Sequence, residues 1–246
     1  MKPPEYFYDR FTRGEGHFSL WLITVLKPIG ILLFKLAFRY RVVNPELHKN
    51  LPSEQGYIVV GNHRSYLDPV FVILTLLPRL PRFIAKEEFF NSGFLAFLAA
   101  RAGAFPLKRN SADKTAIKRA VKMLKRGELV GIFPEGTRIR FKEQVPVYHE
   151  GVALIAHLSG APVLPVHITG AEKICPEGKR FFRCPSITLR YGEPLSITEE
   201  AFASLPKEER FAAFTNEIMA RVAALGEPDN EPQAPAAAPT APDAAL

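Results

Sequence analysis

The sequence predicts an α/β fold, in which a largely parallel mixed sheet is flanked by helices. From residue 57 onward, short runs rich in β-branched and aromatic residues alternate with helical patterns, which is typical of such folds. The length of 246 residues is enough for one large domain with a single core, plus appendages. We therefore expect one sheet-containing domain rather than several small ones.

Residues 18–40 are strongly apolar, and we expect them to form an N-terminal membrane-associated helical segment. Lys27 and Pro28 fall in the middle of this stretch, where a charge is costly in a bilayer and proline favours a break. Two short helices lying in one leaflet, with Lys35 and Arg39 reaching the headgroups, therefore fit the pattern best. A spanning helix and an amphipathic helix packed on the body are the alternatives.

The elements of the body follow from the same patterns. Strands are predicted at residues 57–60, 82–85, 104–107, 129–133, 163–168 and 186–191. Helices are predicted at 69–77, 88–101, 114–126 and 151–159, and a closing helix at 201–225. The helix at 114–126 has an apolar stripe, Ser111 or Asp113 as its cap, and Gly127 at its end. Its lysines indicate a solvated face, with a membrane surface as the alternative.

Charge and composition divide the chain into three regions: 1–45, a membrane-associated helical region; 46–225, the sheet-containing domain; and 226–246, a disordered tail. The whole chain has a net charge of +7, yet the Pro/Ala-rich tail contains four acids and no base. The body is therefore more basic still and favours anionic partners, such as a phospholipid surface or phosphorylated molecules. Nucleic acid is disfavoured because the basic residues are scattered and no aromatic RNA-binding motif accompanies them.

The stretch NHRSYLD at residues 62–68 is the strongest indication of chemistry. It follows a predicted buried strand, and Asp68 with Pro69 is typical of a helix start, with the aspartate as a favoured cap. His63 then lies in a tight connection, where Asp68 can hold one imidazole nitrogen and leave the other to take a proton. No nucleophile is adjacent, so the nucleophile can belong to the substrate. Taken alone, a capping aspartate and a buried histidine also explain the pattern.

Three further segments add to this indication. Residues 103–109, GAFPLKR, end a predicted strand in two cations, which alone would indicate surface charge. Residues 133–138, FPEGTR, form a predicted tight loop that can direct backbone N–H groups and a guanidinium at an anion, although alone it would be an ordinary turn. Residues 161–166, APVLPV, have prolines that shape a buried strand beside these loops.

In this order, the four segments resemble the glycerolipid acyltransferase family, specifically its bacterial 1-acylglycerol-3-phosphate acyltransferases. The resemblance covers roughly residues 57–170, and the His-x4-Asp and FPEGTR blocks are its specific parts. It implies that His63 is the general base and that Asp68 orients it. The implied phosphate-binding residues are Lys108, Arg109 and Arg138. The implied acceptor-binding loop contains Glu135, Gly136 and Thr137.

The resemblance implies an O-acyltransferase that moves a fatty acyl group from acyl-CoA or acyl carrier protein to the sn-2 hydroxyl of lysophosphatidic acid, giving phosphatidic acid. It implies no metal and no cofactor other than the acyl donor. The expected partners are the donor, the lysolipid and a phospholipid membrane, and the expected location is the cytoplasmic face of the cell membrane. The alternatives are an acyltransferase for another lysolipid, glycolipid or aminolipid acceptor, and a non-enzymatic membrane-binding module.

Overall fold

The computed structural model describes residue 8 and residues 20–91, 99–100, 103–107, 113–138, 147–175 and 183–227. Within these ranges the helices are α2 (Leu20–Phe38), α3 (Glu46–Lys49), α4 (Asp68–Leu76), α6 (Lys114–Leu124), α7 (Gly151–Ser159), α8 (Glu200–Ala203) and α9 (Lys207–Ala224). Short 3-10 helices lie at Glu87–Asn91 and Ala171–Lys173.

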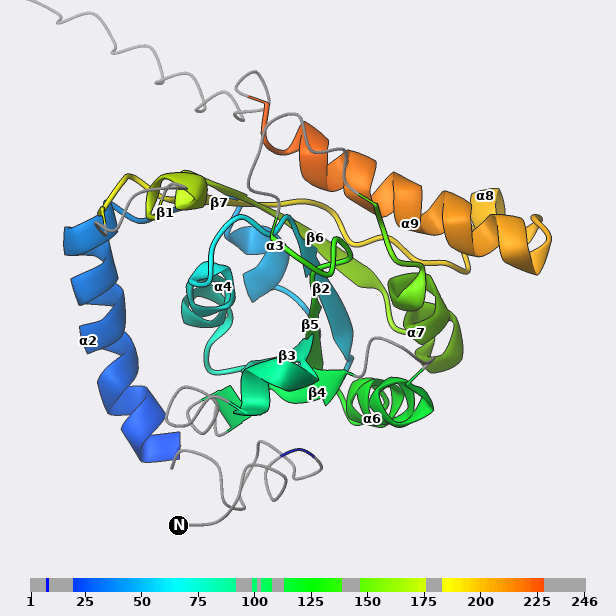
Figure 1. Cartoon of the computed structure of the whole chain (residues 1–246), viewed down its shortest axis with the longest axis horizontal. Coiled ribbons are helices and arrows are strands. Elements are labelled where there is room, and N and C mark those ends of the chain that lie inside the picture. The colour runs from blue at the N-terminus through cyan, green and yellow to red at the C-terminus, as the bar shows by residue number, and fades with distance from the viewer. Residues whose placement is uncertain are drawn as a thin grey trace, which may run out of the picture.

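A seven-stranded sheet forms the centre of the molecule, and its strands follow the order β1-β7-β6-β2-β5-β3-β4 (Figure 1). The strands are β1 (Arg41–Val43), β2 (Tyr57–Gly61), β3 (Pro81–Lys86), β4 (Phe105–Leu107), β5 (Leu129–Ile132), β6 (Val163–Thr169) and β7 (Thr188–Tyr191). All neighbours pair in parallel except β6 and β7, which are antiparallel. The predicted α/β class and the largely parallel sheet are therefore confirmed.

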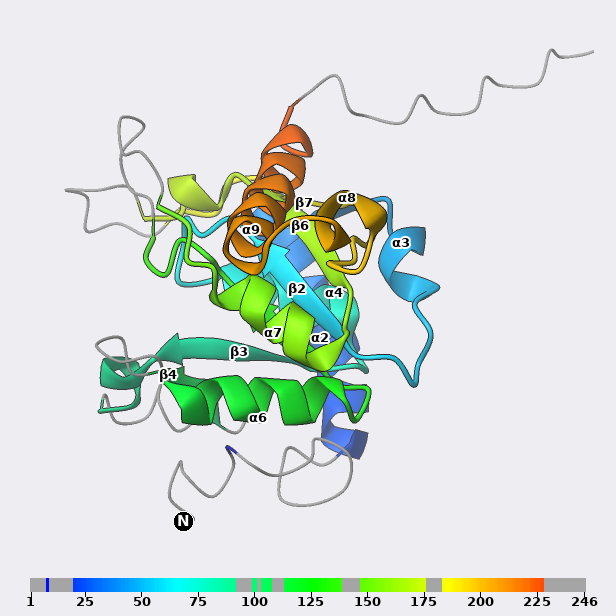
Figure 2. The same cartoon turned by 90° about the vertical axis from the view of Figure 1, so that its right-hand side faces the viewer.

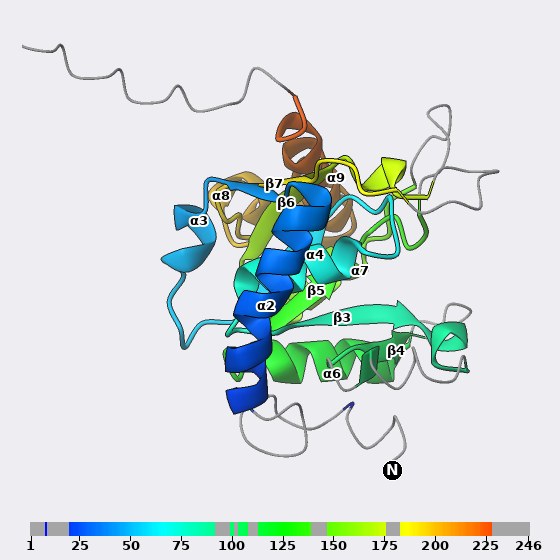
Figure 3. The ribbon, with the colours of Figure 1, turned by 90° about the vertical axis from the view of Figure 1, so that its left-hand side faces the viewer.

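Helices cover both faces of this sheet. Helices α6, α7 and α9 lie on one face (Figure 2), and α2 and α4 lie on the other (Figure 3). Successive side chains of strand β2 point to opposite faces of the sheet. Because helices cover both faces, β2 is buried along its whole length. Ile58 and Val60 pack with α6, α7 and α9, whereas Tyr57 and Val59 pack with α4. The sheet thus separates two hydrophobic cores.

The six predicted strands are present, and the structure adds β1, which the sequence analysis did not predict. This strand has only three residues and precedes the expected start of the domain at residue 46, yet it pairs in parallel with β7. Three residues are too few to show the alternation of apolar and polar side chains from which a strand is predicted. Its place in the sheet depends on a partner almost 150 residues away.

The predicted helices at 69–77, 114–126 and 151–159 correspond to α4, α6 and α7. Asp113 is the cap of α6, where its side chain accepts from the backbone N–H groups of Thr115 and Ala116. The predicted helix at 88–101 lies partly outside the described residues, and its beginning is a 3-10 helix instead of an α-helix. The tail lies outside them from residue 228 onward.

The prediction of one closing helix at 201–225 is wrong, because two helices, α8 and α9, occupy this region. Pro206 separates them with an extended backbone, at φ −53° and ψ 150°. A proline disfavours the helical conformation of the residue before it and lacks an N–H to continue the hydrogen-bond ladder. Helix α9 therefore starts anew after Pro206.

The predicted break at Pro28 is also wrong, because α2 is one helix with Pro28 in its interior. Proline costs a helix about 3 kcal/mol or more in its interior, so packing elsewhere must offset this. Phe34 and Phe38 provide such packing, since their ring centroids lie 5.3 Å and 5.4 Å from that of Phe71 in α4. Within the described part of the chain, no helix has both the length and the apolar character needed to cross a membrane.

Candidate functional site

The candidate site lies at the edge of the sheet where β2 and β5 end. These strands are parallel, and Val60 is the partner of Ile132. The same register, continued beyond the strands, brings His63 level with Glu135. Side chains that follow the carboxyl ends of neighbouring parallel strands therefore meet here, which is the usual place for sites in open α/β sheets.

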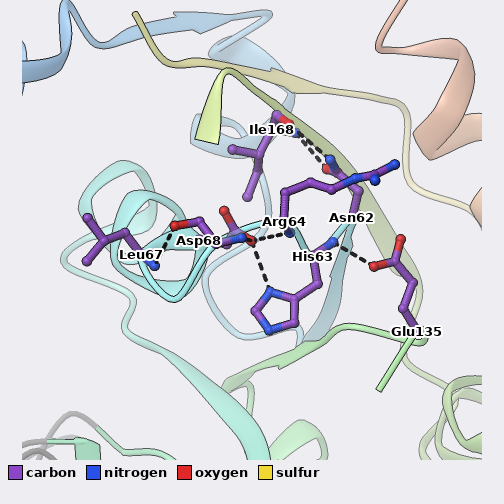
Figure 4. A network of polar contacts seen from close by, with 8 residues as sticks. Asn62, His63, Arg64, Leu67, Asp68, Glu135 and Ile168 are labelled. Carbon is purple, nitrogen blue, oxygen red and sulfur yellow. Dashed lines mark hydrogen bonds and ion pairs between the residues drawn. The ribbon is translucent and has the colours of Figure 1, made fainter. Parts of the chain in front are cut away.

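His63 and Asp68 are in direct contact, as their spacing led us to expect. The His63 Nδ1 atom lies 2.9 Å from Asp68 Oδ2 (Figure 4). The same oxygen accepts from the backbone N–H groups of Arg64 and Ser65, each at 2.7 Å. An oxygen that accepts from two backbone donors acts as an acceptor for the ring as well. Nδ1 is therefore the nitrogen that donates to Asp68, and in the neutral imidazole the lone pair is then on Nε2.

The expected role of Asp68 as a helix cap needs correction. The N-cap of α4 is Leu67, and Asp68 is the first helical residue, followed by Pro69. Its carboxylate points back to the preceding turn and binds backbone N–H groups there, instead of those of its own helix. Asp68 is fully buried, and its Oδ1 atom has no hydrogen-bond partner among the described residues.

Two phenylalanine rings support the imidazole from one side. The ring of His63 stacks on Phe133, with centroids 4.4 Å apart and planes 12° apart. Phe133 in turn stacks on Phe83 at 5.3 Å and 15°. The His63 side chain keeps 19% of its surface exposed. The stack therefore fixes the plane of the imidazole while leaving one side open to a substrate.

Glu135 connects the two loops of the site. Its Oε2 atom accepts from the backbone N–H of His63 at 3.0 Å, and its side chain is buried (Figure 4). Burial is the main cause that raises the Glu135 pKa to about 7, and the charge of Asp68 raises it further. The His63 hydrogen bond and the Arg64 charge act in the opposite direction. This pair of loops is consequently held by a carboxyl that titrates near neutrality.

Asn62 fixes the loop after β2 from the other side. Its Nδ2 atom donates to the carbonyl of Ile168 at 2.9 Å, and its Oδ1 accepts from the N–H of Ile168 at 2.8 Å (Figure 4). Ile168 belongs to β6, which pairs with β2 along this edge. The loop that contains His63 is therefore tied to both neighbouring strands.

The remaining residues of the predicted acceptor loop form a tight turn after β5. Gly136 has a φ of +60°, and its N–H donates to the carbonyl of Phe133 at 2.9 Å. Glycine adopts this left-handed conformation without strain. Thr137 is exposed, and the guanidinium carbon of Arg138 lies 3.4 Å from the centroid of the Tyr66 ring. The turn thus brings Arg138 back to the loop of His63.

The structure brings together most of the residues that the sequence analysis selected. His63, Asp68 and Glu135 form one network, and Gly136 to Arg138 continue from it. Lys108 and Arg109 follow β4 but lie outside the described residues, so their roles stay predictions. Sequence reasoning missed three contributors: Asn62, Tyr66 and Phe133. Each belongs to a selected segment, but no spacing rule indicates that its side chain contacts a residue 70 or more positions away.

Comparison with known proteins agrees with this geometry. The sequence model of the Acyltransferase family matches residues 42–169. The chain is 34% identical over 194 residues to a 1-acyl-sn-glycerol-3-phosphate acyltransferase of Bacillus subtilis, covering 79% of this chain and 92% of that protein. The chain belongs to the acyltransferase family.

Other relatives extend the comparison to plants and to a solved structure. A chloroplast 1-acyl-sn-glycerol-3-phosphate acyltransferase of Brassica napus is 31% identical over 70% of this chain, which spans 47% of that longer protein. The crystal structure of the 1-acyl-sn-glycerophosphate (LPA) acyltransferase PlsC from Thermotoga maritima superimposes with a TM-score of 0.64. It is 27% identical and covers 84% of this chain and 80% of its own. The α/β sheet is thus shared with a member of the family.

Substitution of Gly131 by alanine tests the support of the imidazole. A Cβ at this position of β5 would collide with the ring of Phe83, which is buried and stacks on Phe133. We expect Gly131→Ala to displace the stack and lower kcat by about tenfold or more, since small displacements of a catalytic group cost large factors in rate. The measurement is kcat per folded enzyme, with folding checked by circular dichroism.

Gly151→Ala is the matched control, because a Cβ at that position meets no atom of the described residues within 4 Å. It should keep the wild-type kcat. A folded Gly131→Ala variant with wild-type kcat would show that the stack does not position His63.

The raised pKa of Glu135 predicts a specific dependence of stability on pH. The folded protein keeps this proton up to about pH 7, whereas the unfolded chain releases it near the ordinary pKa of 4.5. The folded state is therefore favoured by proton binding at low pH, and this contribution is lost as the pH rises through that window. The free energy of unfolding of the wild type and of Glu135→Gln is measured with denaturant from pH 4.5 to 8. It should decrease less with rising pH in the variant than in the wild type.

Glutamine keeps an acceptor for the His63 N–H but has no proton to release. Glu150→Gln, which removes one negative charge from the exposed residue before α7, is the control and should follow the wild-type curve. If the free energy of unfolding changed with pH in the same way for all three proteins, the raised pKa of Glu135 would be contradicted.

Proposed function

We propose that the chain transfers a fatty acyl group from acyl-CoA or acyl carrier protein to the sn-2 hydroxyl of 1-acylglycerol-3-phosphate, giving phosphatidic acid. The observation that carries this proposal is the 2.9 Å contact between His63 and Asp68, which leaves Nε2 of the ring available as a base. The names of the relatives in bacteria and plants support the same acceptor.

The chemistry starts from a weak nucleophile. An alcohol is far too weak an acid to ionise at neutral pH, so it needs a base as it attacks. Nε2 of His63 takes the proton of the acceptor hydroxyl while the hydroxyl oxygen bonds to the thioester carbonyl carbon. The carbon–sulfur bond then breaks, and the proton passes from His63 to the departing thiolate. Asp68 stabilises the imidazolium that exists between these two transfers.

Binding of both substrates in one place replaces a covalent intermediate. When the hydroxyl and the thioester are held in contact, the reaction becomes effectively intramolecular, and the enzyme needs no nucleophile of its own. The ordered support of His63 by Asp68, Phe133 and Asn62 fits this requirement, since the base must meet the hydroxyl at hydrogen-bond distance. That the reaction needs no metal and no cofactor stays a prediction.

The acceptor's phosphate requires cations near the base. Arg138 comes from the loop after β5 and lies against Tyr66 in the loop of His63, so it is suited to bind a phosphomonoester beside the reacting hydroxyl. Lys108 and Arg109, which follow β4, are proposed to complete this site. Glu135, Gly136 and Thr137 form the loop that holds Arg138 in place.

We propose that α2 attaches the enzyme to a phospholipid membrane, at the cytoplasmic face of the cell membrane. The outer side of α2 exposes Ile29, Leu32, Leu33 and Leu36, with between 49% and 71% of each residue accessible. Phe34 and Phe38 hold the opposite side of the helix on α4 through Phe71. A contiguous exposed apolar face of this kind is typical of a lipid or protein contact, and an acceptor that resides in a bilayer favours lipid.

Substitution of His63 by alanine tests the proposed reaction. We expect kcat with 1-acylglycerol-3-phosphate to fall by about 10²–10⁴-fold, because general base catalysis contributes this much. The assay uses purified protein, labelled acyl-CoA or acyl carrier protein, and a panel of lysolipids, with the products resolved by mass. It also compares the proposed acceptor with other lysolipids.

His157→Ala is the matched control, because His157 is exposed on α7 and its ring contacts Phe211 away from the site. This variant should keep full activity. Wild-type turnover by a correctly folded His63→Ala protein would refute the assignment of the base.

Introduction of charge on α2 tests the membrane contact. Leu33 and Leu36 are 59% and 71% exposed, and burial of a leucine contributes about 1.5–3 kcal/mol. We expect the double substitution Leu33→Glu and Leu36→Glu to weaken binding to phospholipid vesicles by at least about tenfold, measured by flotation. The fold should persist, because these side chains do not contribute to either core.

Leu158→Glu is the control for this experiment. Leu158 is 46% exposed on α7, across the sheet from α2 (Figure 1). If Leu158→Glu reduced vesicle binding as much as the α2 substitutions, the contact would not be specific to α2.

A further inference from the structure

Tyr66 is an exposed aromatic residue in the loop between His63 and Asp68. It has 70% of its surface accessible, so burial in a core does not explain its presence. Its ring contacts Arg138, whose guanidinium carbon lies 3.4 Å from the ring centroid. A cation at this distance over an aromatic ring is attracted by the negative face of the ring.

This contact connects two loops that already share a hydrogen bond. Tyr66 is three residues after His63, and Arg138 is three residues after Glu135. The backbone N–H of His63 donates to Glu135 at 3.0 Å. The loops are therefore joined beside His63, by this hydrogen bond and by the stack of His63 on Phe133, and again beside Arg138. The contact with Tyr66 adds a connection at the end of the loop that carries the cation.

The ring contact leaves the binding capacity of the guanidinium intact. A guanidinium carbon 3.4 Å from the ring centroid leaves room only for a face-on contact, because an edge-on guanidinium would push its nitrogens into the ring. The N–H donors of the group then point outward in its plane. A phosphate oxygen pair binds a guanidinium through those in-plane donors. Stacking and phosphate binding are thus compatible. The stack also restricts the long arginine side chain before the ligand arrives, which reduces the entropy lost on binding.

We propose that Tyr66 is a positioning residue that holds Arg138 ready for the phosphate of the acceptor, and thereby favours acceptors with an anionic headgroup. This inference rests on the proposed function, in which Arg138 binds that phosphate. Tyr66 acts through Arg138 and takes no part in the proton transfer. Its loss should therefore weaken acceptor binding while the rate at saturation changes little.

A double-mutant cycle with Arg138 tests this role. Acceptor and donor KM and kcat are measured for the wild type, Tyr66→Leu, Tyr66→Phe, Arg138→Ala and the double variant Tyr66→Leu/Arg138→Ala. Detergent mixed micelles are used so that vesicle attachment does not enter the result. Tyr66→Leu should raise the KM for 1-acylglycerol-3-phosphate about three- to fivefold, the range of an exposed cation–π contact. The donor KM and kcat should stay within about twofold of the wild type.

Tyr66→Phe retains the ring face, so its acceptor KM should remain near the wild-type value. In the Arg138→Ala background, Tyr66→Leu should have no further effect. Glycerol 3-phosphate, which carries the headgroup without the acyl chain, should inhibit the wild type and Tyr66→Phe more strongly than Tyr66→Leu. Circular dichroism verifies that each variant is folded.

The outcomes separate this inference from the proposed function. An unchanged acceptor KM in Tyr66→Leu, or the same increase with Arg138 absent, overturns the role of Tyr66 while the acylation activity stands. Lost vesicle binding in the flotation assay, with an unchanged acceptor KM in micelles, would instead indicate a membrane contact of the ring and also overturns it. If the wild type fails to acylate 1-acylglycerol-3-phosphate, the proposed function is wrong and the inference falls with it.

Discussion

One carboxylate oxygen organises the site of this acyltransferase-family protein. Oδ2 of Asp68 accepts from two backbone N–H groups and from the imidazole of His63, all within a stretch of six residues. The two backbone bonds shape the turn between β2 and α4, and the third fixes the tautomer of the histidine. A single buried carboxyl group therefore shapes the loop and orients the imidazole of His63. Its removal would affect both at once.

The rest of the site depends on where that loop is placed. The parallel pairing of β2 with β5 sets His63 beside Glu135, and the pairing of β2 with β6 sets Asn62 beside Ile168. The first pairing allows one hydrogen bond and the second allows two, all of which a free loop would lack. The geometry of the candidate site is thus inherited from the sheet, whose central strand β2 is buried along its whole length and tolerates little movement.

Electrostatics adds a second level of organisation. The carboxyl groups of Asp68 and Glu135 lie on either side of the His63 backbone. The positive charge of Arg64 lowers the pKa of Glu135. Burial is the main cause that raises the Glu135 pKa, and the nearby charge of Asp68 raises it further. Asp68 has three donors, whereas Glu135 has the His63 N–H. The hydrogen bond that Glu135 accepts from His63 lowers its pKa but does not offset the effect of burial.

The sequence by itself determined the strands of β2 to β7, the parallel class of the sheet, and the contact between His63 and Asp68. The strands follow from the local periodicity of apolar residues. The contact between His63 and Asp68 follows from their spacing of five positions, because the chain itself keeps residues so near in sequence close together. Tertiary structure alone decided the pairing of β1 with β7, the continuity of α2 through Pro28, and the meeting of Tyr66 with Arg138. Such contacts depend on strand register and on packing between distant segments, and no local pattern encodes either of them.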